Sequence, residues 1–210
     1  FIRDLNVVSS SSNYSSYYIK KQEDFSFENK IDWKIKQKNV YSVIEKLHPK
    51  TVLDLGANTG WYSILAEKEG AKVIAIDIDE MSIDLLYRYA KSKSLKILSL
   101  FLPFDKLNRE IFGKPQSNEI YKDRDFKNNP IYLSPTYRLK SELVLCLALF
   151  HHLVLGDGMN IGSCLDLLSK MTEKRLVLEF IDLEDPAIKN EPTFFKNLEK
   201  HSSATYNLDV

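Results

Sequence analysis

The sequence predicts an α/β protein with a doubly wound, mainly parallel sheet. From Thr51 onward, apolar segments of strand length alternate with segments of helical pattern. The strands are continuously apolar, as in "KVIAI" and "LVLCLAL", which is typical of parallel strands covered on both faces. A short glycine turn joins the first of these strands to a helix. A ligand is therefore expected at the carboxyl ends of the strands.

Composition places the chain among ordinary globular proteins. Its 210 residues are enough for one domain with a large core, and 44% hydrophobic with 28% charged residues argues against global disorder. Basic and acidic residues number 29 each, so nucleic acid and anionic membranes are not expected as partners. No apolar run reaches the roughly 20 residues of a membrane span, and a signal peptide is not recognisable. A cytoplasmic location is expected by default.

The ends of the chain and its cysteines allow further expectations. Position 1 is Phe rather than Met, so the chain is expected to be part of a longer polypeptide. Residues 1–30 include the serine-rich "SSSSNYSSYY" and are interpreted as a tether or lid, before a domain that spans 31–210. Cys146 and Cys164 lie in apolar segments and are expected to be buried thiols, with reactive or bridging cysteines as the alternative.

The elements are expected in the following order. A helix with Asp32 as its N-cap continues to Leu47, ends before Pro49 and carries a lysine-rich polar face that is interpreted as solvated. Asp79 is expected to cap a later helix. The expected strands are 51–55, 72–76, 95–100, 143–148 and 175–181, and the remaining expected helices are 61–69, 80–92, 160–171 and 192–200.

Two regions depart from a regular alternation. The segment 102–140 holds four prolines and is expected to form a lid or to carry small helices of its own. After residue 181 at most one more strand fits, so the C-terminal strand pair of such a fold is expected to be truncated, which would expose a sheet edge.

The stretch "TVLDLGANTGWYSILAEKEGAKVIAIDID", from Thr51 to Asp79, identifies the expected ligand. Gly56 and Gly60 do not make the three-glycine fingerprint of dinucleotide enzymes. Asp54, just before the turn, would repel a pyrophosphate and suits a cationic ligand. Asp77 follows the turn by about 20 residues, where an acid can accept hydrogen bonds from ribose hydroxyls. An ammonium, a sulfonium and a ribose occur together in S-adenosylmethionine.

The same stretch resembles a known family. "VLDLGANTGWYSILA" and "GAKVIAIDID" resemble the first two motifs of class I, Rossmann-like, S-adenosylmethionine-dependent methyltransferases, and "LVLCLALFHHLVLG" resembles their fourth-strand motif. "DLGANTG", "LALFHHL", "LVLEFI" and "EDPAI", in that order, are similar to bacterial methyltransferases of the nodulation or host-specificity type. The resemblance covers roughly residues 14–190.

The resemblance implies a set of site residues. The methionine part of the cofactor is expected at the turn, the ribose at Asp77 and the adenine at Ile78. Where the family often has an acid after the third strand, this chain reads "LFLPFD", so either Asp105 substitutes or the backbone alone holds adenine. The implied cofactor-binding residues are Asp54, Gly56, Ala57, Asn58, Gly60, Asp77, Ile78, Asp105 and Ala148.

Candidate catalytic residues follow the later strands. His151 and His152 come directly after the fourth strand, where an imidazole can act as a general base, although a packed histidine at a helix start is the alternative. Glu179 lies at the end of the fifth strand and is expected to bind substrate, to orient a histidine or to support the scaffold. No metal is expected, because adjacent histidines rarely point the same way.

Methyl transfer from S-adenosylmethionine to a small-molecule or carbohydrate-like acceptor is the expected function. Two alternatives stay open. The first is a non-catalytic module that keeps the cofactor pocket. The second is an NAD-dependent oxidoreductase, which Asp54 and the missing glycine disfavour. The sequence does not indicate an oligomeric state.

Overall fold

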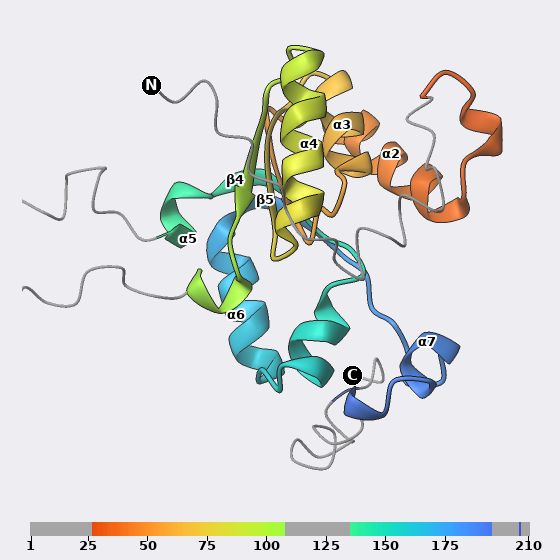
Figure 1. Ribbon diagram of the computed structural model, residues 1–210, viewed down its shortest axis with the longest axis vertical. Helices are drawn as coiled ribbons and strands as arrows, with labels where there is room; N and C mark the ends of the chain where they lie inside the picture. The colour runs from red at the N-terminus through yellow and green to blue at the C-terminus, as the bar shows by residue number, and fades with distance from the viewer. Residues whose placement is uncertain (1–26, 108–134, 195–205, 207–210) are drawn as a thin grey trace, which may run out of the picture. The chain divides into compact units, whose positions relative to one another are not determined.

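A computed structural model describes residues 27–107, 135–194 and 206 of the chain (Figure 1). The described residues divide into two compact units, with the boundary between Leu102 and Pro103. The predicted tether or lid at 1–30 and the segment 102–140 lie mostly outside these residues. The predicted helix 192–200 does so from residue 195 onward.

The strands form a five-stranded sheet in the order β3-β2-β1-β4-β5. Their pairings within each unit are parallel, which confirms the predicted doubly wound fold. Among the described residues no strand follows β5. The strands are β1 (Thr51–Leu55), β2 (Lys72–Asp77), β3 (Ile97–Phe101), β4 (Ser141–Cys146) and β5 (Thr172–Leu178).

In the first unit, three helices cover the strands β1, β2 and β3. Helix α3 (Trp61–Lys68) packs against β1 and β2, helix α4 (Glu80–Ser92) packs against β2 and β3, and α2 (Ile35–Leu47) packs on α3 (Figure 1). Asp79 caps α4 as predicted, because its carboxylate accepts a hydrogen bond from Met81 N at 3.2 Å. A buried apolar cluster joins these elements and consists of Ala57, Ile64, Ala75 and Leu86.

The prediction for the first helix was wrong at its start. Trp33 has an extended backbone and is only 7% exposed, with its ring edge-on to Tyr41 and to Trp61. Trp33 packs in this aromatic cluster with an extended backbone, and a residue with an extended backbone cannot belong to a helix that begins at Asp32. A 3₁₀ turn, η1 (Lys30–Asp32), precedes α2, whose N-cap is Lys34.

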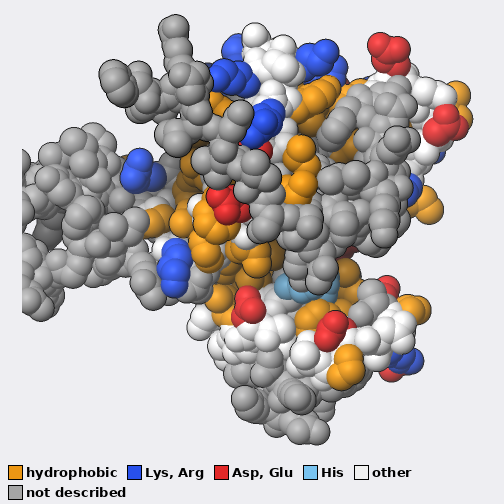
Figure 2. All heavy atoms as spheres, viewed as in Figure 1, with side chains coloured by type: hydrophobic (Ala, Val, Ile, Leu, Met, Phe, Trp, Pro, Cys, Tyr) orange, Lys and Arg blue, Asp and Glu red, His pale blue; other side chains and the backbone are white. Residues whose placement is uncertain are grey.

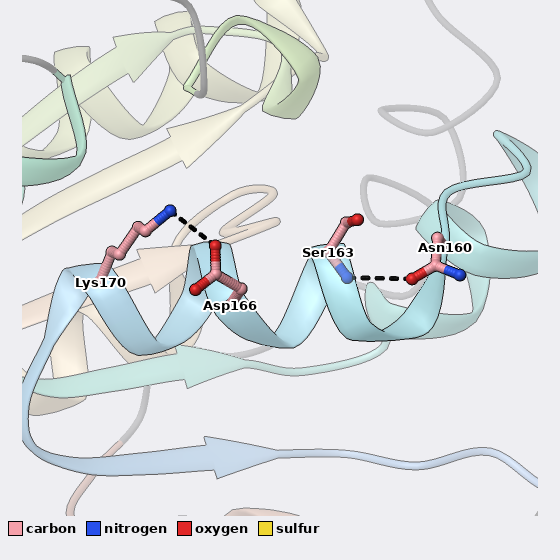
Figure 3. Close-up of polar contacts among 4 residues, drawn as sticks. All are labelled: Asn160, Ser163, Asp166 and Lys170. Carbon is pink, nitrogen blue, oxygen red and sulfur yellow. Dashed lines mark hydrogen bonds and ion pairs between the residues drawn. The ribbon is translucent and has the colours of Figure 1, made fainter.

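In the second unit, helix α6 (Ile161–Met171) packs against β4 and β5. Asn160 caps it by accepting from Ser163 N at 3.1 Å, and Lys170 pairs with Asp166 on its exposed face (Figure 3). Three short elements lie before β4 or after β5: η2 (Phe104–Lys106), α5 (Pro135–Arg138) and α7 (Pro186–Lys189).

Three features of this unit differ from the predictions. Strand β4 begins and ends two residues earlier than expected. Strand β5 lies three residues earlier than expected, so Glu179 follows the strand instead of lying within its end. A π-helical segment, η4 (His152–Gly156), follows β4 where the sequence showed no sign of one. Such segments are rare and are frequently found at functional sites.

The structure confirms the predicted burial of the two cysteines. Cys146 and Cys164 are buried free thiols, and burial raises the pKa of the Cys164 thiol to about 11, so it stays protonated at neutral pH. Side chains of both signs occur on the face shown in Figure 2. Within the described ranges, no helix has the length and apolar character of a membrane span.

Gly60 offers a test of how tightly the turn packs on α4. Its φ is +85°, and an added Cβ would lie 2.7 Å from Leu86 Cδ2 and closer still to Cδ1, in the buried cluster. We expect Gly60→Ala to lower the free energy of unfolding by about 2–4 kcal/mol, the sum of left-handed strain and overpacking.

Gly70→Ala is the matched control, because Gly70 has a φ of +97° and no atom within 4 Å of an added Cβ. We expect it to cost only the strain, about 1 kcal/mol. Urea unfolding measures both variants. Equal losses would contradict the packing argument.

Candidate functional site

The turn after β1, residues 56–60, is built from alternating left-handed residues. Gly56, Asn58 and Gly60 have φ values of 72°, 50° and 85°. The N–H groups of Gly56 and Ala57 both donate to the carbonyl of Ile76 in β2, at 2.9 and 3.0 Å. This turn, called the β1 turn below, is therefore anchored to the neighbouring strand before α3 begins.

Asp77, the last residue of β2, holds the β1 turn from the other side. Its Oδ2 accepts from Asn58 N at 2.7 Å, and its Oδ1 accepts from Asp79 N at 2.9 Å. Burial raises the pKa of the Asp77 carboxyl, and these backbone hydrogen bonds oppose the rise. The sequence assigned Asp77 to a ligand, and the structure adds a role in holding the turn to α4.

Asp54 is a buried acid in β1. Its side chain is 2% exposed, and its Oδ2 accepts from the hydroxyl of Ser63 in α3 at 2.6 Å. Burial raises the pKa of Asp54 to about 6, with a smaller contribution in the same direction from the charge of Asp77. Ser63 and the charge of Lys36 oppose the rise. A carboxylate in this setting favours a nearby cation.

Lys36 is a residue that the sequence reasoning missed. It was placed on a solvated lysine face, but it is half-buried, its charge stabilises the ionised form of Asp54, and its Nζ lies 5.8 Å from the centre of the Tyr62 ring. Every lysine in "KIKQK" has the same sequence character. Only the packing of α2 on α3 distinguishes Lys36 from the rest.

The remaining predicted residues of the first unit have mixed placements. Asn58 uses its side chain within the turn, accepting from Thr59 N at 2.7 Å and from Ser82 Oγ at 3.5 Å. The Ala57 side chain points into the buried cluster. Ile78 is 63% exposed just beyond β2. Trp61 is buried, and its ring contacts Tyr62.

In the second unit, the turn after β4 repeats this kind of anchoring. Ala148 has a φ of 51°, and its N–H donates to Glu179 Oε2 at 2.6 Å. Glu179 N donates to the carbonyl of Cys146 at 3.0 Å. Residues 147–149 are called the β4 turn below. Asp105, the predicted adenine contact, lies in η2, and its side chain falls outside the described part.

The two predicted histidines differ in their environments. Their rings lie 4.2 Å apart, and both meet Phe194 edge-on, at 5.8 Å for His151 and 5.4 Å for His152. His151 is 5% exposed, whereas His152 is half-buried. Burial lowers the pKa of His152, and the charges of Asp157 and Glu191 oppose this. His152 is therefore mostly neutral at pH 7.

Phe150, the residue before His151, belongs to an aromatic stack. Tyr206 stacks on Phe180 at 4.7 Å and on Phe150 at 6.2 Å, and its hydroxyl donates to the carbonyl of Ile181 at 3.0 Å. Burial raises the pKa of Tyr206 to about 12. This hydroxyl is therefore a structural donor at neutral pH. The described residues contain no cluster of three or more His, Cys, Asp or Glu side chains arranged to hold a metal ion.

Parts of this chain are similar to known proteins. Residues 17–110 match the family model of tellurite resistance protein TehB. Nodulation protein NoeA from Rhizobium meliloti (strain 1021) is 27% identical over 142 residues, which are 67% of this chain and 27% of NoeA. The chain thus spans about a quarter of the length of that relative.

Solved structures with the same fold include WbdD, a bifunctional kinase-methyltransferase. In its co-crystal with the kinase inhibitor LY294002, the match has a TM-score of 0.50 at 21% identity and covers 72% of this chain and 30% of WbdD. TehB from Haemophilus influenzae gives 0.42 at 16% identity over 75% of this chain and 40% of TehB. The chain therefore has the same Rossmann-like fold as WbdD, and its residues 17–110 are similar to the TehB family.

Proposed function

We propose that the chain binds S-adenosylmethionine at the β1 turn and transfers its methyl group to a small-molecule or carbohydrate-like acceptor. The observation that carries this proposal is the pair of carboxylates near the carboxyl ends of β1 and β2. Asp54 and Asp77 are close enough for the charge of one to raise the pKa of the other. Such a pair disfavours a pyrophosphate and favours a ligand with a cationic group.

The residues around the β1 turn fit the parts of this cofactor. Each Asp77 oxygen accepts one backbone N–H, and a carboxylate offers about four acceptor positions, which leaves capacity for two ribose hydroxyls. Ile78 offers exposed apolar surface for adenine. Asp54 would balance the ammonium of the methionine part, and Lys36 its carboxylate. The opposite charges of Asp54 and Lys36 thus complement the two charges of the zwitterionic methionine part.

The second unit supplies a candidate base. S-adenosylmethionine carries its methyl group on a sulfonium, so the protein has mainly to orient the acceptor and, where needed, to remove its proton. His152 is half-buried and neutral at pH 7, as this task requires. His151 is almost fully buried between His152 and Phe194, which supports a packing role for that imidazole.

The class of acceptor is inferred from one relative and from the charge balance of the chain. NoeA is a nodulation protein, and this chain covers only 27% of it. The equal numbers of acidic and basic residues disfavour a polyanion such as RNA or DNA as the acceptor. We therefore assign a small or carbohydrate-like acceptor. A module that only binds the cofactor would share the β1 turn but would not turn over.

Calorimetric titration tests the cofactor. We expect S-adenosylhomocysteine to bind with a micromolar or lower Kd and NAD to show no binding at the same concentrations. Binding of NAD alone would overturn the proposal. Release of S-adenosylhomocysteine from S-adenosylmethionine, measured with a panel of oligosaccharides, then separates a methyltransferase from a binding module.

Asp77→Asn tests the ribose assignment while keeping one of the two acceptor oxygens. An alanine would release the N–H groups of both Asn58 and Asp79, whereas asparagine releases only one of them and therefore disturbs the turn less. We expect the asparagine variant to bind S-adenosylhomocysteine roughly 10- to 100-fold more weakly, because hydrogen bonds to a charged group are lost. Asp84→Asn, at an exposed ion pair with Arg88 on α4, is the control and should bind normally. Unchanged affinity in Asp77→Asn would contradict the assignment.

Asp54 makes cofactor binding and stability depend on pH in opposite directions. Its pKa is about 6 in the folded chain against 3.8 ordinarily, so the folded state holds the proton more tightly. As the pH falls from 7 to 5, we expect the ligand-free chain to gain stability at this site. Affinity for S-adenosylhomocysteine should fall about tenfold, because the ligand ammonium loses its carboxylate.

Asp54→Asn is the control for this pH dependence. The ionised group costs about 3 kcal/mol at pH 7. We expect the free energy of unfolding of the variant to be roughly 1–2 kcal/mol higher than that of the parent at pH 7. The gain is smaller than the full cost of the ionised group, because burying the uncharged amide also costs free energy. It should also bind weakly at every pH between 5 and 7. The measurements are titrations and urea unfolding at each pH. A variant as pH-dependent as the parent would show that another group is responsible.

A further inference from the structure

The β4 turn contains an unusual backbone conformation. Four non-glycine residues in the described part have a positive φ: His48, Asn58, Ser94 and Ala148. His48 and Ser94 follow the helices α2 and α4, where left-handed residues are common. Asn58 compensates with its own side chain. Alanine has a Cβ that disfavours this conformation and no polar group to compensate, so another residue has to hold it.

Glu179 meets that requirement on both sides of the turn. Its N–H donates to Cys146, the last residue of β4, and its Oε2 accepts from Ala148 N at 2.6 Å. One residue thus binds the chain before and within the turn. Strand β4 ends at Cys146, so Ala148 N has no strand carbonyl to pair with, and the Glu179 carboxylate is its acceptor.

The first unit contains the same arrangement. Asp77 ends β2, the neighbour of β1, and accepts from the left-handed Asn58 at 2.7 Å. Glu179 follows β5, the neighbour of β4, and accepts from the left-handed Ala148. In both cases an acid at the end of one strand, or just after it, holds the turn that follows the neighbouring strand. The recurrence indicates a shared structural task.

We propose that Glu179 is a positioning residue that holds the β4 turn, and through it the two histidines, and that it is not the base of the reaction. Leu147 and Phe150 are buried on either side of the exposed Ala148. His151 follows immediately, and η4 begins at His152. The direction in which the chain leaves Ala148 therefore sets where both imidazoles lie.

The consequence for catalysis rests on the methyl-transfer function proposed above. The geometric assignment itself does not. A base or a substrate ligand at Glu179 needs the negative charge, whereas a positioning residue needs only an acceptor oxygen at the same place. Glutamine keeps that oxygen and loses the charge, and alanine loses both. Glycine at position 148 adopts the left-handed conformation without help and should remove the need for Glu179.

The experiment follows the titration of His152 by NMR in the ligand-free chain, so it requires neither cofactor nor acceptor. His152→Asn assigns its signal among the four histidines. The variants are Glu179→Gln, Glu179→Ala, Ala148→Gly, and the double variant Glu179→Ala with Ala148→Gly. Asp157 and Glu191 are the charges that oppose the lowering of the His152 pKa, and Glu179→Gln, which removes only a charge, shows whether the Glu179 charge acts on this readout directly.

We expect Glu179→Gln and Ala148→Gly to titrate like the parent. Glu179→Ala should move the His152 midpoint upward by roughly half a pH unit, because the imidazole becomes more exposed. The double variant should restore the parental value. If glutamine behaves like alanine, if the double variant stays shifted, or if no variant shifts, the positioning role is wrong.

Two further comparisons keep the result interpretable. If Glu179→Ala does not fold, parental titration in both Glu179→Gln and the double variant still supports the proposal, and a shift in either overturns it. Affinity for S-adenosylhomocysteine, measured on the same samples, reports separately on the proposed cofactor site. If the parent chain does not bind S-adenosylhomocysteine, the proposed function is refuted, but the positioning role of Glu179 is not affected.

Discussion

The hydrogen bonds that Asp77 accepts from Asn58 and Asp79 are the constraint on which the first unit depends. The β1 turn alternates left-handed residues, so its N–H groups need acceptors outside a regular helix, and those of Gly56 and Ala57 use the carbonyl of Ile76 in β2. Asp77 supplies one of them. Through Asp79 it also fixes the residue that caps α4. Turn, strand and helix therefore meet at a single carboxylate.

This arrangement has an electrostatic cost. Asp54 lies close enough to Asp77 to feel its charge and is almost completely buried, so the ionised pair is destabilised in the ligand-free chain. Ser63 and Lys36 offset only part of this, because the pKa of Asp54 stays near 6. A bound cation would remove the remainder. The free energy by which the ionised pair destabilises the first unit would therefore contribute to the binding of a cation. Such a trade-off between stability and function is common at binding sites.

Patterns of local sequence predicted most of the fold. Continuous apolar runs located β1 and β2 to within a residue, and the sequence "IDID" before a helical pattern identified Asp79 as a cap. Long-range packing explains the errors. Trp33 packs against the rings of Tyr41 in α2 and Trp61 in α3 and therefore lies outside the helix. Strand β5 begins at Thr172 because that residue pairs with Ser141 of β4. No local pattern contains these contacts.

The sequence singles out the acids of the candidate site but not the contacts that these acids make. Asp54 and Asp77 stand out because acids at strand ends are costly without a role, yet nothing in the sequence indicates that Asp77 holds a left-handed Asn58. Lys36 cannot be recognised among neighbouring lysines, because its distinction is its distance from Tyr62 and Asp54. The positive φ of Ala148 is equally hidden, because alanine carries no turn signal.

A strand-end acid can combine two tasks that sequence reasoning treats as alternatives, holding a turn and binding a ligand. A carboxylate has about four acceptor positions, so the bonds that hold a turn do not use up its capacity for a ligand. Asp77 has positions left after two backbone donors, and its exposed neighbour Ile78 gives a ligand access. Glu179 holds the exposed Ala148 in the same way. Because the supporting bond comes from the backbone of the turn itself, a ligand bound to either acid would be coupled directly to the conformation of that turn.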